Sequence, residues 1–234
     1  MSSGAAASRL GIGIVGAGRV GPVLARALAG AGHAIIGITA VGIESRERAA
    51  ALLPGVPILE VAEVVRRSEL VLFAVPGSEL PDLVSGLAAT GAWQPGQLVI
   101  HTAPEHGFGV FAPALAAGVI PLALHPAMVF TGTSLDLTRL AEATMAVTAP
   151  APVLPIGQAL AVEMGAEPVI VAEEDRAAYA EAVGAAREFS RAVVRQGIDA
   201  LREIGIERPD HVVAGIVRAA VEEELIAGEP DPEM

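Results

Sequence analysis

The chain has 234 residues, enough for one large domain or for one domain with a smaller appendage. It contains no cysteine, which excludes disulfide bonds, thiolate metal sites and cysteine nucleophiles. The formal net charge of −12 argues against nucleic acid and against an anionic membrane surface as partners. The chain also lacks lysine, which excludes Schiff-base chemistry through a lysine side chain.

A glycine turn stands between the first strand, expected at 10–15, and the first helix, expected at 19–30. It reads Gly16-Ala17-Gly18-Arg19-Val20-Gly21. In a dinucleotide-binding fold Gly16 permits the tight turn, Gly18 lets the backbone approach a pyrophosphate, and Gly21 lets the helix pack close to the strand. The helix N-terminus adds unpaired N–H groups. We therefore predict that all six residues bind a dinucleotide; the alternative is a glycine-rich loop that binds nothing.

Strand-like and helical segments alternate from the glycine turn to Val171. The expected strands are 10–15, 34–40, 69–75, 97–101, 119–125, 143–148 and 167–171, and the helices between them are 19–30, 45–53, 78–90, 109–116 and 152–164. This alternation predicts an α/β fold with a doubly wound, mainly parallel Rossmann sheet.

The pattern then changes to two amphipathic helices, expected at 173–204 and 210–226. We therefore expect two domains: a dinucleotide-binding Rossmann-like domain at 1–172, and a small all-helical C-terminal domain at 173–234 that forms the substrate side. A helical pair of this size has too little core to fold alone, so it must pack on the sheet domain or on a second subunit. We expect a homodimer through the C-terminal helices, each of which packs on its twin or on the other sheet domain.

Two further observations bear on location. No apolar run is long enough for a membrane span, and residues 1–9 lack the apolar stretch of a signal peptide. We therefore expect a cytoplasmic protein that does not bind membranes.

The end of the second strand bears on the choice of cofactor. An NAD site usually carries an acidic residue there, but the strand at 34–40 ends without one. Ser45, Arg46 and Arg48 follow, and hydroxyl and guanidinium groups suit a 2′-phosphate. We predict NADP as the cofactor, with Ser45 and Arg46 among its ligands. In the alternative interpretation, Ser45 caps the next helix and the arginines form a solvated face.

Ligands of open α/β sheets bind beyond the carboxyl ends of the strands. The third strand ends in Val75-Pro76, the fourth in His101-Thr102 and the fifth in His125-Pro126. We predict that Val75, Pro76 and Thr102 contact the cofactor. Histidine can donate a proton to a carbonyl or hold a carboxylate, so His125 and His101 are the predicted catalytic residues. Which of them donates the proton stays open, and a structural role is the alternative for each.

A metal site is not expected, because Glu105 is the only carboxylate that accompanies these histidines.

These motifs together resemble a known family. The glycine turn, Ala74-Val75-Pro76, His101-Thr102, and His125-Pro126 followed by Phe130 are similar to those of NADP-oxidoreductase-like proteins. Those proteins have a Rossmann-like N-terminal domain and a C-terminal domain of unknown function, and are relatives of the ketopantoate reductase and 6-phosphogluconate dehydrogenase superfamily. The resemblance implies NADP binding and oxidoreductase activity.

Some positions depart from the family pattern. Ala103-Pro104 stands where the family has Ser-Gly, Ala180 follows Tyr179 where the family has His, and Glu188 replaces an asparagine. These departures lie on the substrate side of the expected site.

Two functions are compatible with these residues and motifs. The first is an NADP-dependent reductase or dehydrogenase that acts on a small oxo or hydroxy acid, for example a ketopantoate-like substrate. Arg187 or Arg191 of the long helix would then hold the carboxylate. The second is a non-catalytic NADP(H)-binding sensor or regulatory protein, which the departures from the family pattern favour.

Overall fold

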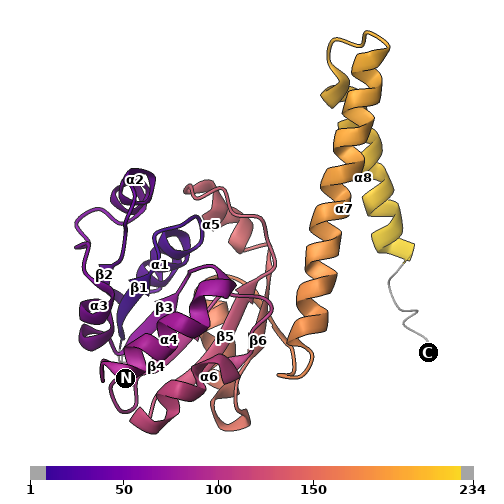
Figure 1. The fold of residues 1–234 in the computed structure, drawn as a ribbon. Coiled ribbons are helices and arrows are strands. Elements are labelled where there is room, and N and C mark those ends of the chain that lie inside the picture. Colours follow the sequence, from indigo (N-terminus) through magenta and orange to yellow (C-terminus); the bar gives the residue numbers. More distant parts are fainter. Residues whose placement is uncertain (1–8, 228–234) are drawn as a thin grey trace, which may run out of the picture. The chain divides into compact units, whose positions relative to one another are not determined.

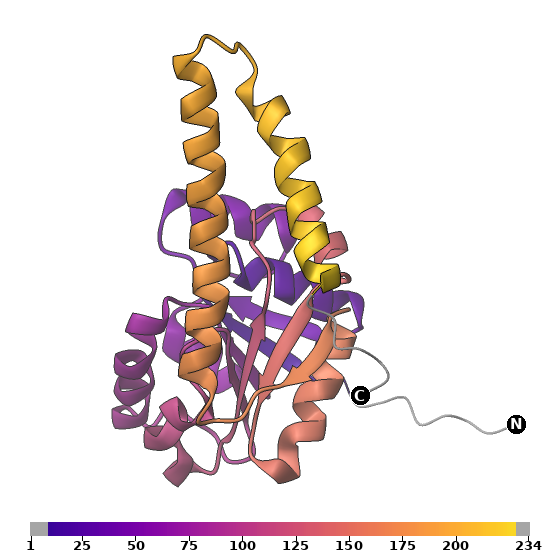
Figure 2. The ribbon, with the colours of Figure 1, turned by 90° about the vertical axis from the view of Figure 1, so that its right-hand side faces the viewer.

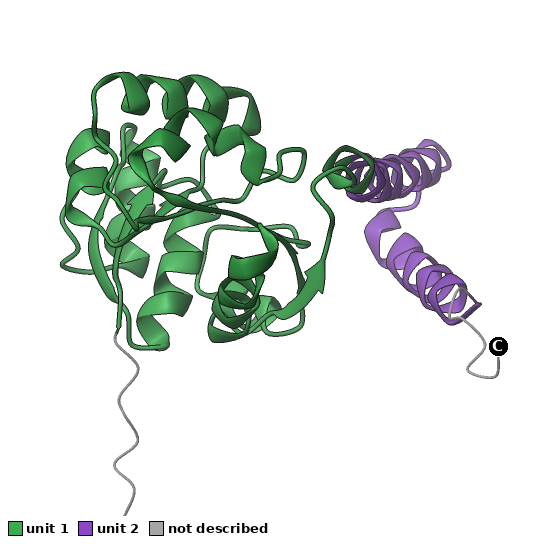
Figure 3. Ribbon diagram, turned by 90° about the horizontal axis from the view of Figure 1, so that it is seen from below, with its two compact units in different colours: residues 1–180 green, residues 181–234 purple. Residues whose placement is uncertain are grey.

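The computed structural model describes residues 9–227, so the expectation about residues 1–9 falls almost wholly outside it. The chain divides into two compact units, residues 1–180 and 181–234, shown in green and purple in Figure 3. The boundary predicted from the sequence lies between 172 and 173. The start of the long helix thus belongs to the first unit.

The first unit is built on a seven-stranded sheet in the order β2-β1-β3-β4-β5-β6-β7 (Figure 1). Strands β1 to β5 are parallel, β6 runs antiparallel to β5, and β7 is parallel to β6. Their bounds are β1 Gly11–Val15, β2 Ala34–Ile38, β3 Leu70–Phe73, β4 Leu98–His101, β5 Ile120–Pro126, β6 Thr144–Thr148 and β7 Glu167–Ile170. This topology confirms the predicted doubly wound, mainly parallel Rossmann sheet.

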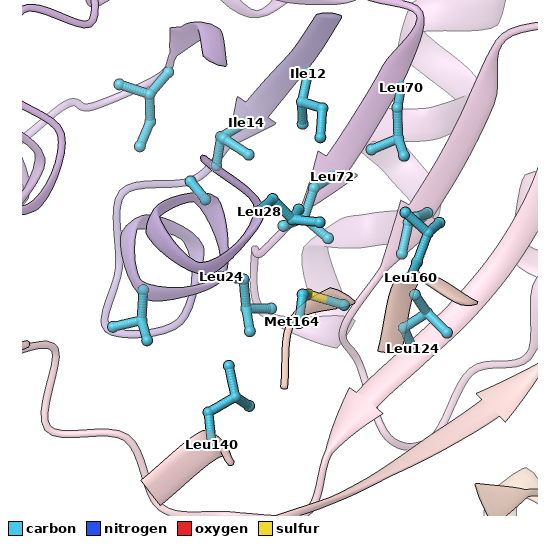
Figure 4. Close-up of a cluster of buried hydrophobic side chains, with 14 of the residues drawn as sticks. Ile12, Ile14, Leu24, Leu28, Leu70, Leu72, Leu124, Leu140, Leu160 and Met164 are labelled. Atoms are coloured by element: carbon cyan, nitrogen blue, oxygen red, sulfur yellow. The ribbon is translucent and has the colours of Figure 1, made fainter. Parts of the chain in front are cut away.

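Two apolar clusters cover the two faces of the sheet. Successive residues of a strand point to opposite faces, so Leu70 and Leu72 enter one cluster while Val71 and Phe73 enter the other. The first cluster contains residues of α1 (Gly21–Gly30), α2 (Ile43–Leu52), α5 (Leu135–Leu140) and α6 (Leu154–Glu163). Figure 4 shows this cluster, with Leu24 and Leu28 of α1 among the strand residues.

The second cluster contains residues of α3 (Val61–Arg67), α4 (Leu80–Ala89) and the 3₁₀ segment η2 (Phe108–Ala117). Two shorter 3₁₀ turns, η1 (Gly77–Glu79) and η3 (Ala151–Val153), follow β3 and β6. Helices on both faces leave the carboxyl ends of β1, β3, β4 and β5 together at one edge of the sheet.

Several elements differ from the sequence prediction. The segment expected as an α-helix at 109–116 is the 3₁₀ segment η2, and it contains Pro113, which lacks the N–H that an α-helix interior requires. Helices α3 and α5 were not predicted, because seven and six residues are too few for a helical period to stand out. Helix α2 begins at Ile43 with Gly42 as its N-cap. Ser45 is therefore not the N-cap residue, and its hydroxyl donates to the Gly42 carbonyl at 2.7 Å.

The second unit consists of helices, as predicted. Helix α7 (Arg176–Glu203) starts in the first unit and continues without a break into the second, where a loop joins it to α8 (Pro209–Ala227) (Figure 2). Gly205 has a φ of +85°, which suits a residue just beyond a helix end, and Pro209 opens α8. A Cβ at Gly197 would lie 3.3 Å from the side chain of Val213, so the two helices pack closely there. No helix within residues 9–227 is long and apolar enough to cross a membrane.

Candidate active site

The glycine turn has the geometry that each of its glycines was predicted to provide. Gly16 has a φ of +109°, and a Cβ there would lie 2.5 Å from the Ala74 carbonyl oxygen. A Cβ at Gly21 would lie 2.1 Å from the Gly16 carbonyl oxygen, whereas a Cβ at Gly18 would meet nothing within 4 Å. The first and third glycines are thus required by packing, and the second borders open space.

The backbone amides of this turn are free to bind an anion. Gly16 donates its N–H to the Thr39 hydroxyl at 2.8 Å, but none of the amides of residues 17–20 donates to another described residue. Val20, the N-cap of α1, makes no capping bond with its side chain. Free amides at the start of a helix are the usual anion site of dinucleotide-binding folds, so the turn fits a pyrophosphate.

Arg48, which the sequence offered only as a group that suits a 2′-phosphate, braces this turn, and a second side chain that the sequence did not single out holds the neighbouring loop. Arg48 donates from Nη1 to the Ala17 carbonyl at 3.3 Å, and its side chain packs against Gly132 in the loop after β5. That loop is held by Asp136, a fully buried carboxylate that accepts the amides of Thr131 and Gly132 at 2.8 Å each. The only sequence signal for Asp136 was a run of turn-forming residues before it.

The remaining predicted cofactor ligands lie around the turn or near the start of α2. Arg19 is exposed and lies beside Gly132, and Val75 packs close to Gly16. Arg46 is exposed, with Nε 3.4 Å from the Val41 carbonyl oxygen. Pro76 follows β3 and is exposed, and Thr102 follows β4, where its amide donates to the Phe73 carbonyl at 3.1 Å.

His101 is enclosed, and both of its ring nitrogens are used by the backbone. Nδ1 accepts the amide of Ala103 at 3.2 Å, so Nε2 carries the proton and donates to the Gly107 carbonyl at 2.9 Å. The ring is fully buried and packs against Phe111. Burial lowers the pKa of His101 to about 3. His101 therefore stays neutral and shapes the 101–107 loop.

His125 has one nitrogen held and the other free. Its Nδ1 lies 2.9 Å from the hydroxyl oxygen of Tyr179, while Nε2 has no partner among the described residues. Burial, with a smaller contribution from the positive charge of Arg176, lowers the pKa of His125 to about 4. Burial also raises the pKa of Tyr179, against the opposing effect of Arg176. Both side chains are neutral at pH 7.

Arg176, the first residue of α7, lies beside this pair. Its guanidinium donates from Nε to the His106 carbonyl and from Nη2 to the Ala103 carbonyl, both at 2.9 Å, and its Cζ lies 5.5 Å from the centre of the Tyr179 ring. The side chain is 1% exposed. Arg176 was not predicted from the sequence, which pointed to Arg187 and Arg191 instead; these are exposed residues of the second unit.

A third contact holds the same segment in place. The Glu173 carboxylate accepts the amides of Phe108 and Gly109 at 2.8 Å each. Glu173 and Arg176 thus hold the segment before α7 and its first turn against the residues that follow β4, and Tyr179 holds the same turn against strand β5. In the part of the chain that the structure describes, no three His, Cys, Asp or Glu side chains are grouped as a metal would require.

A parallel sheet with this glycine turn and a polar group at the same edge defines a dinucleotide-binding Rossmann fold. The chain belongs to the Rossmann-like domain family, whose model matches residues 1–126. A second family model, a domain of unknown function named DUF2520, matches residues 143–230. This pair of domains is the combination that the sequence resemblance implied. A comparison with curated proteins gave no match.

Solved structures share the fold over nearly the whole chain. A Bacteroides fragilis protein that is provisionally described as an NADP oxidoreductase is 18% identical, with a TM-score of 0.72 over 96% of this chain and 82% of the other. A 1-pyrroline-5-carboxylate reductase from Streptococcus pyogenes is 17% identical, with a TM-score of 0.68 over 96% and 82%. A semialdehyde dehydrogenase NAD-binding protein from Cupriavidus necator is 16% identical, with a TM-score of 0.67 over 97% and 87%.

Proposed function

We propose that this protein is an NADP-dependent oxidoreductase that acts on a small oxo or hydroxy acid. The observation that carries the proposal is the His125–Tyr179 hydrogen bond of 2.9 Å, which orients a free imidazole nitrogen at the sheet edge that bears the glycine turn. Strands β3 and β4 lie between β1 and β5 in the sheet. The glycine turn after β1 and the imidazole of His125 on β5 are therefore about 14 Å apart along that edge. The names of the similar structures include NADP and NAD proteins, which supports this class of cofactor.

We infer a partner on this chain for the pyrophosphate and for the 2′-phosphate of the cofactor. The free amides of residues 17–20 would hold the pyrophosphate, and Ser45 and Arg46 near the start of α2 would contact a 2′-phosphate. Val75, Pro76 and Thr102 would line the path toward β5. When bound, the nicotinamide exchanges a hydride with the substrate carbon.

The proton is the part of the reaction that the chain itself handles. When Nδ1–H of neutral His125 donates to the Tyr179 oxygen, the Nε2 lone pair can accept the proton of a substrate hydroxyl during oxidation. The resulting imidazolium returns that proton to the substrate oxygen during reduction. We assign this role to His125 rather than His101, because both nitrogens of His101 are engaged by the backbone.

A turnover screen tests the proposal. NADPH oxidation is measured with a panel of 2-oxo acids that includes ketopantoate, and NADPH binding is measured separately by calorimetry. We expect at least one acid to be reduced. Tight NADPH binding without turnover would instead favour the non-catalytic sensor, which the departures at Ala103-Pro104 and Glu188 also favour.

We further propose that the protein is a homodimer formed through α7 and α8. Large apolar side chains are exposed on both helices, among them Phe189 at 70% and Val193 at 60% on α7, and Ile216 and Leu225 at 68% each on α8. An exposed apolar surface on so small a helical unit is typical of an interface. The sequence is the basis for proposing a cytoplasmic location, and the oxidoreductases among the similar structures also support a small-molecule substrate.

A further inference from the structure

The guanidinium of Arg176 has an unused donor. Nε and Nη2 are bonded to the carbonyls of His106 and Ala103, but Nη1 has no hydrogen-bond partner although it is buried. A buried, unpaired polar group costs free energy, and the cost is larger for a charged one. In a side chain that is 1% exposed, Nη1 is the group that a ligand would satisfy.

The positive charge of Arg176 makes no direct ion pair, although Glu173 and Glu105 act on it from farther away and oppose the lowering of its pKa by burial. No carboxylate within residues 9–227 lies within ion-pair distance of it. The Glu173 carboxylate, three residues earlier, is engaged by the amides of Phe108 and Gly109, and Glu105 is exposed on the loop after β4. The N-terminus of α7, which begins at Arg176, adds the positive end of a 28-residue helix.

This charge lies next to the pair that we assign to proton transfer. The guanidinium carbon is 5.5 Å from the centre of the Tyr179 ring, and the Tyr179 hydroxyl is 2.9 Å from Nδ1 of His125. A group that binds at Arg176 therefore lies next to Tyr179, the residue that holds His125, and Arg176 is near enough to His125 to lower its pKa.

We propose that Arg176 binds the carboxylate of the substrate through Nη1, beside the His125–Tyr179 pair. This inference rests on the proposed function and deepens it, because it gives the acid group of the oxo or hydroxy acid a specific partner. It replaces Arg187 and Arg191 in that role. Arg176 contributes to the low pKa of His125, so a carboxylate that offsets its charge would also make His125 a better proton carrier once substrate is bound.

A spectroscopic experiment tests this binding without requiring turnover. Tyr179 is the only tyrosine in the chain, so labelling tyrosine with ¹³C at Cζ gives a single resonance from this site. Acetate and acetamide have nearly the same shape, but only acetate carries a charge. We expect acetate to shift the Tyr179 resonance saturably in the full-length protein, with and without NADP⁺, and acetamide to leave it unchanged.

Variants assign the effect to Arg176. Arg176→Met should weaken acetate binding by about ten- to a hundredfold, the loss of one charge-assisted hydrogen bond. Arg187→Met, on the exposed surface of the same helix, should bind acetate as the wild type does. If Arg176→Met does not fold, Arg176→Lys is the second variant. Lysine keeps the positive charge but cannot direct planar N–H donors to Ala103, His106 and a ligand at once, so this variant should still bind acetate more weakly than the wild type.

Three results would overturn the inference: no acetate shift in the wild type, equal shifts from acetate and acetamide, or wild-type acetate affinity in a folded Arg176 variant. Its failure is distinct from that of the proposed function. Turnover of an oxo acid without an acetate response at Tyr179 would remove only the role of Arg176. An acetate response in a protein that does not bind NADPH would remove the proposed function and leave the anion site.

Discussion

The imidazole Nδ1 of His125 lies 2.9 Å from the hydroxyl oxygen of Tyr179, although 54 residues separate them in the sequence. His125 is the next-to-last residue of strand β5, and Tyr179 lies in the first turn of α7. The bond fixes the orientation of the ring and leaves Nε2 free, which is how catalytic histidines are usually held by a neighbouring group. The start of α7 is therefore part of the candidate active site.

Removing either partner should slow turnover with the oxo acid that the screen identifies. His125→Ala should lower kcat by about 10²- to 10⁴-fold, the usual contribution of a positioned acid–base group. Tyr179→Phe keeps the ring but removes the hydroxyl, so we expect a smaller decrease of roughly tenfold from loss of orientation. NADPH affinity, measured by calorimetry, should stay nearly unchanged in both variants. Unaltered kcat in His125→Ala would show that the histidine is structural.

His101 should influence stability at low pH more than turnover. Its pKa is about 3 in the folded protein and about 6.5 in an unfolded chain, so the unfolded state takes up a proton first as the pH falls. The contribution of His101 to the unfolding free energy is therefore complete above pH 6.5. Between pH 6.5 and 3 the unfolding free energy falls by up to about 1.4 kcal/mol per pH unit.

His101→Gln should therefore be less stable than the wild type at pH 8, but should lose less stability on going to pH 5. Urea unfolding, followed by the fluorescence of Trp93, measures the unfolding free energy of the first unit at pH 8 and at pH 5. Trp93 is the only tryptophan in the chain and lies in that unit. His211→Gln replaces an exposed histidine and controls for the substitution itself. The same stability loss between pH 8 and 5 in His101→Gln and wild type would contradict this account of His101.

The sequence predicted the sheet, the glycine turn and the two C-terminal helices because these depend on local patterns. Apolar runs, a fixed glycine spacing and a helical period are visible within short windows of the chain. The sequence also placed His101 and His125 at strand ends. The sequence could not separate the roles of the two histidines, because each role depends on what covers that side chain in the fold. His101 lies on the same face of the sheet as Val99, and Phe111 covers it there.

The other parts of the site depend on contacts that are distant in sequence. Arg176 bonds to the carbonyl of Ala103, 73 residues earlier, and nothing in its own neighbourhood marks it as buried. The long helix contains several arginines, and the pattern of the helix alone does not show which one meets the sheet. The contact of Arg48 with Ala17 escaped prediction for the same reason.

Gly18→Val should abolish cofactor binding and leave the fold intact. A Cβ at Gly18 meets no atom within 4 Å, so the added side chain occupies only the space where a pyrophosphate would lie. Calorimetry with NADPH should show no binding, while the unfolding free energy stays within about 0.5 kcal/mol of wild type. Gly86→Val, in α4, makes the same change in open space away from the turn and should bind NADPH normally. Wild-type affinity in Gly18→Val would rule out the glycine turn as the cofactor site.

Arg46 should determine the preference between the two nicotinamide cofactors. Its exposed guanidinium lies near the start of α2, where the 2′-phosphate of NADPH would meet it, and β2 ends without an acidic residue. We expect wild type to bind NADPH more tightly than NADH. Arg46→Ala should weaken NADPH binding by about 1.5–3 kcal/mol and leave NADH binding unchanged. Arg66→Ala, an exposed arginine in α3, is the control. Equal wild-type affinities for both cofactors would contradict the preference.

The exposed apolar side chains of α7 should hold two chains together. Phe189 and Val193 are one helical turn apart and so lie on the same face of α7, where both are more than half exposed. Phe189→Glu combined with Val193→Glu places two charges on that face, which a dimer would have to bury without partners. Light scattering at micromolar concentration should show a dimer for wild type and a monomer for the double variant. Arg191→Gln changes a residue about 200° around the helix from Phe189 and should leave the dimer intact. A monomeric wild type would contradict the proposed dimer.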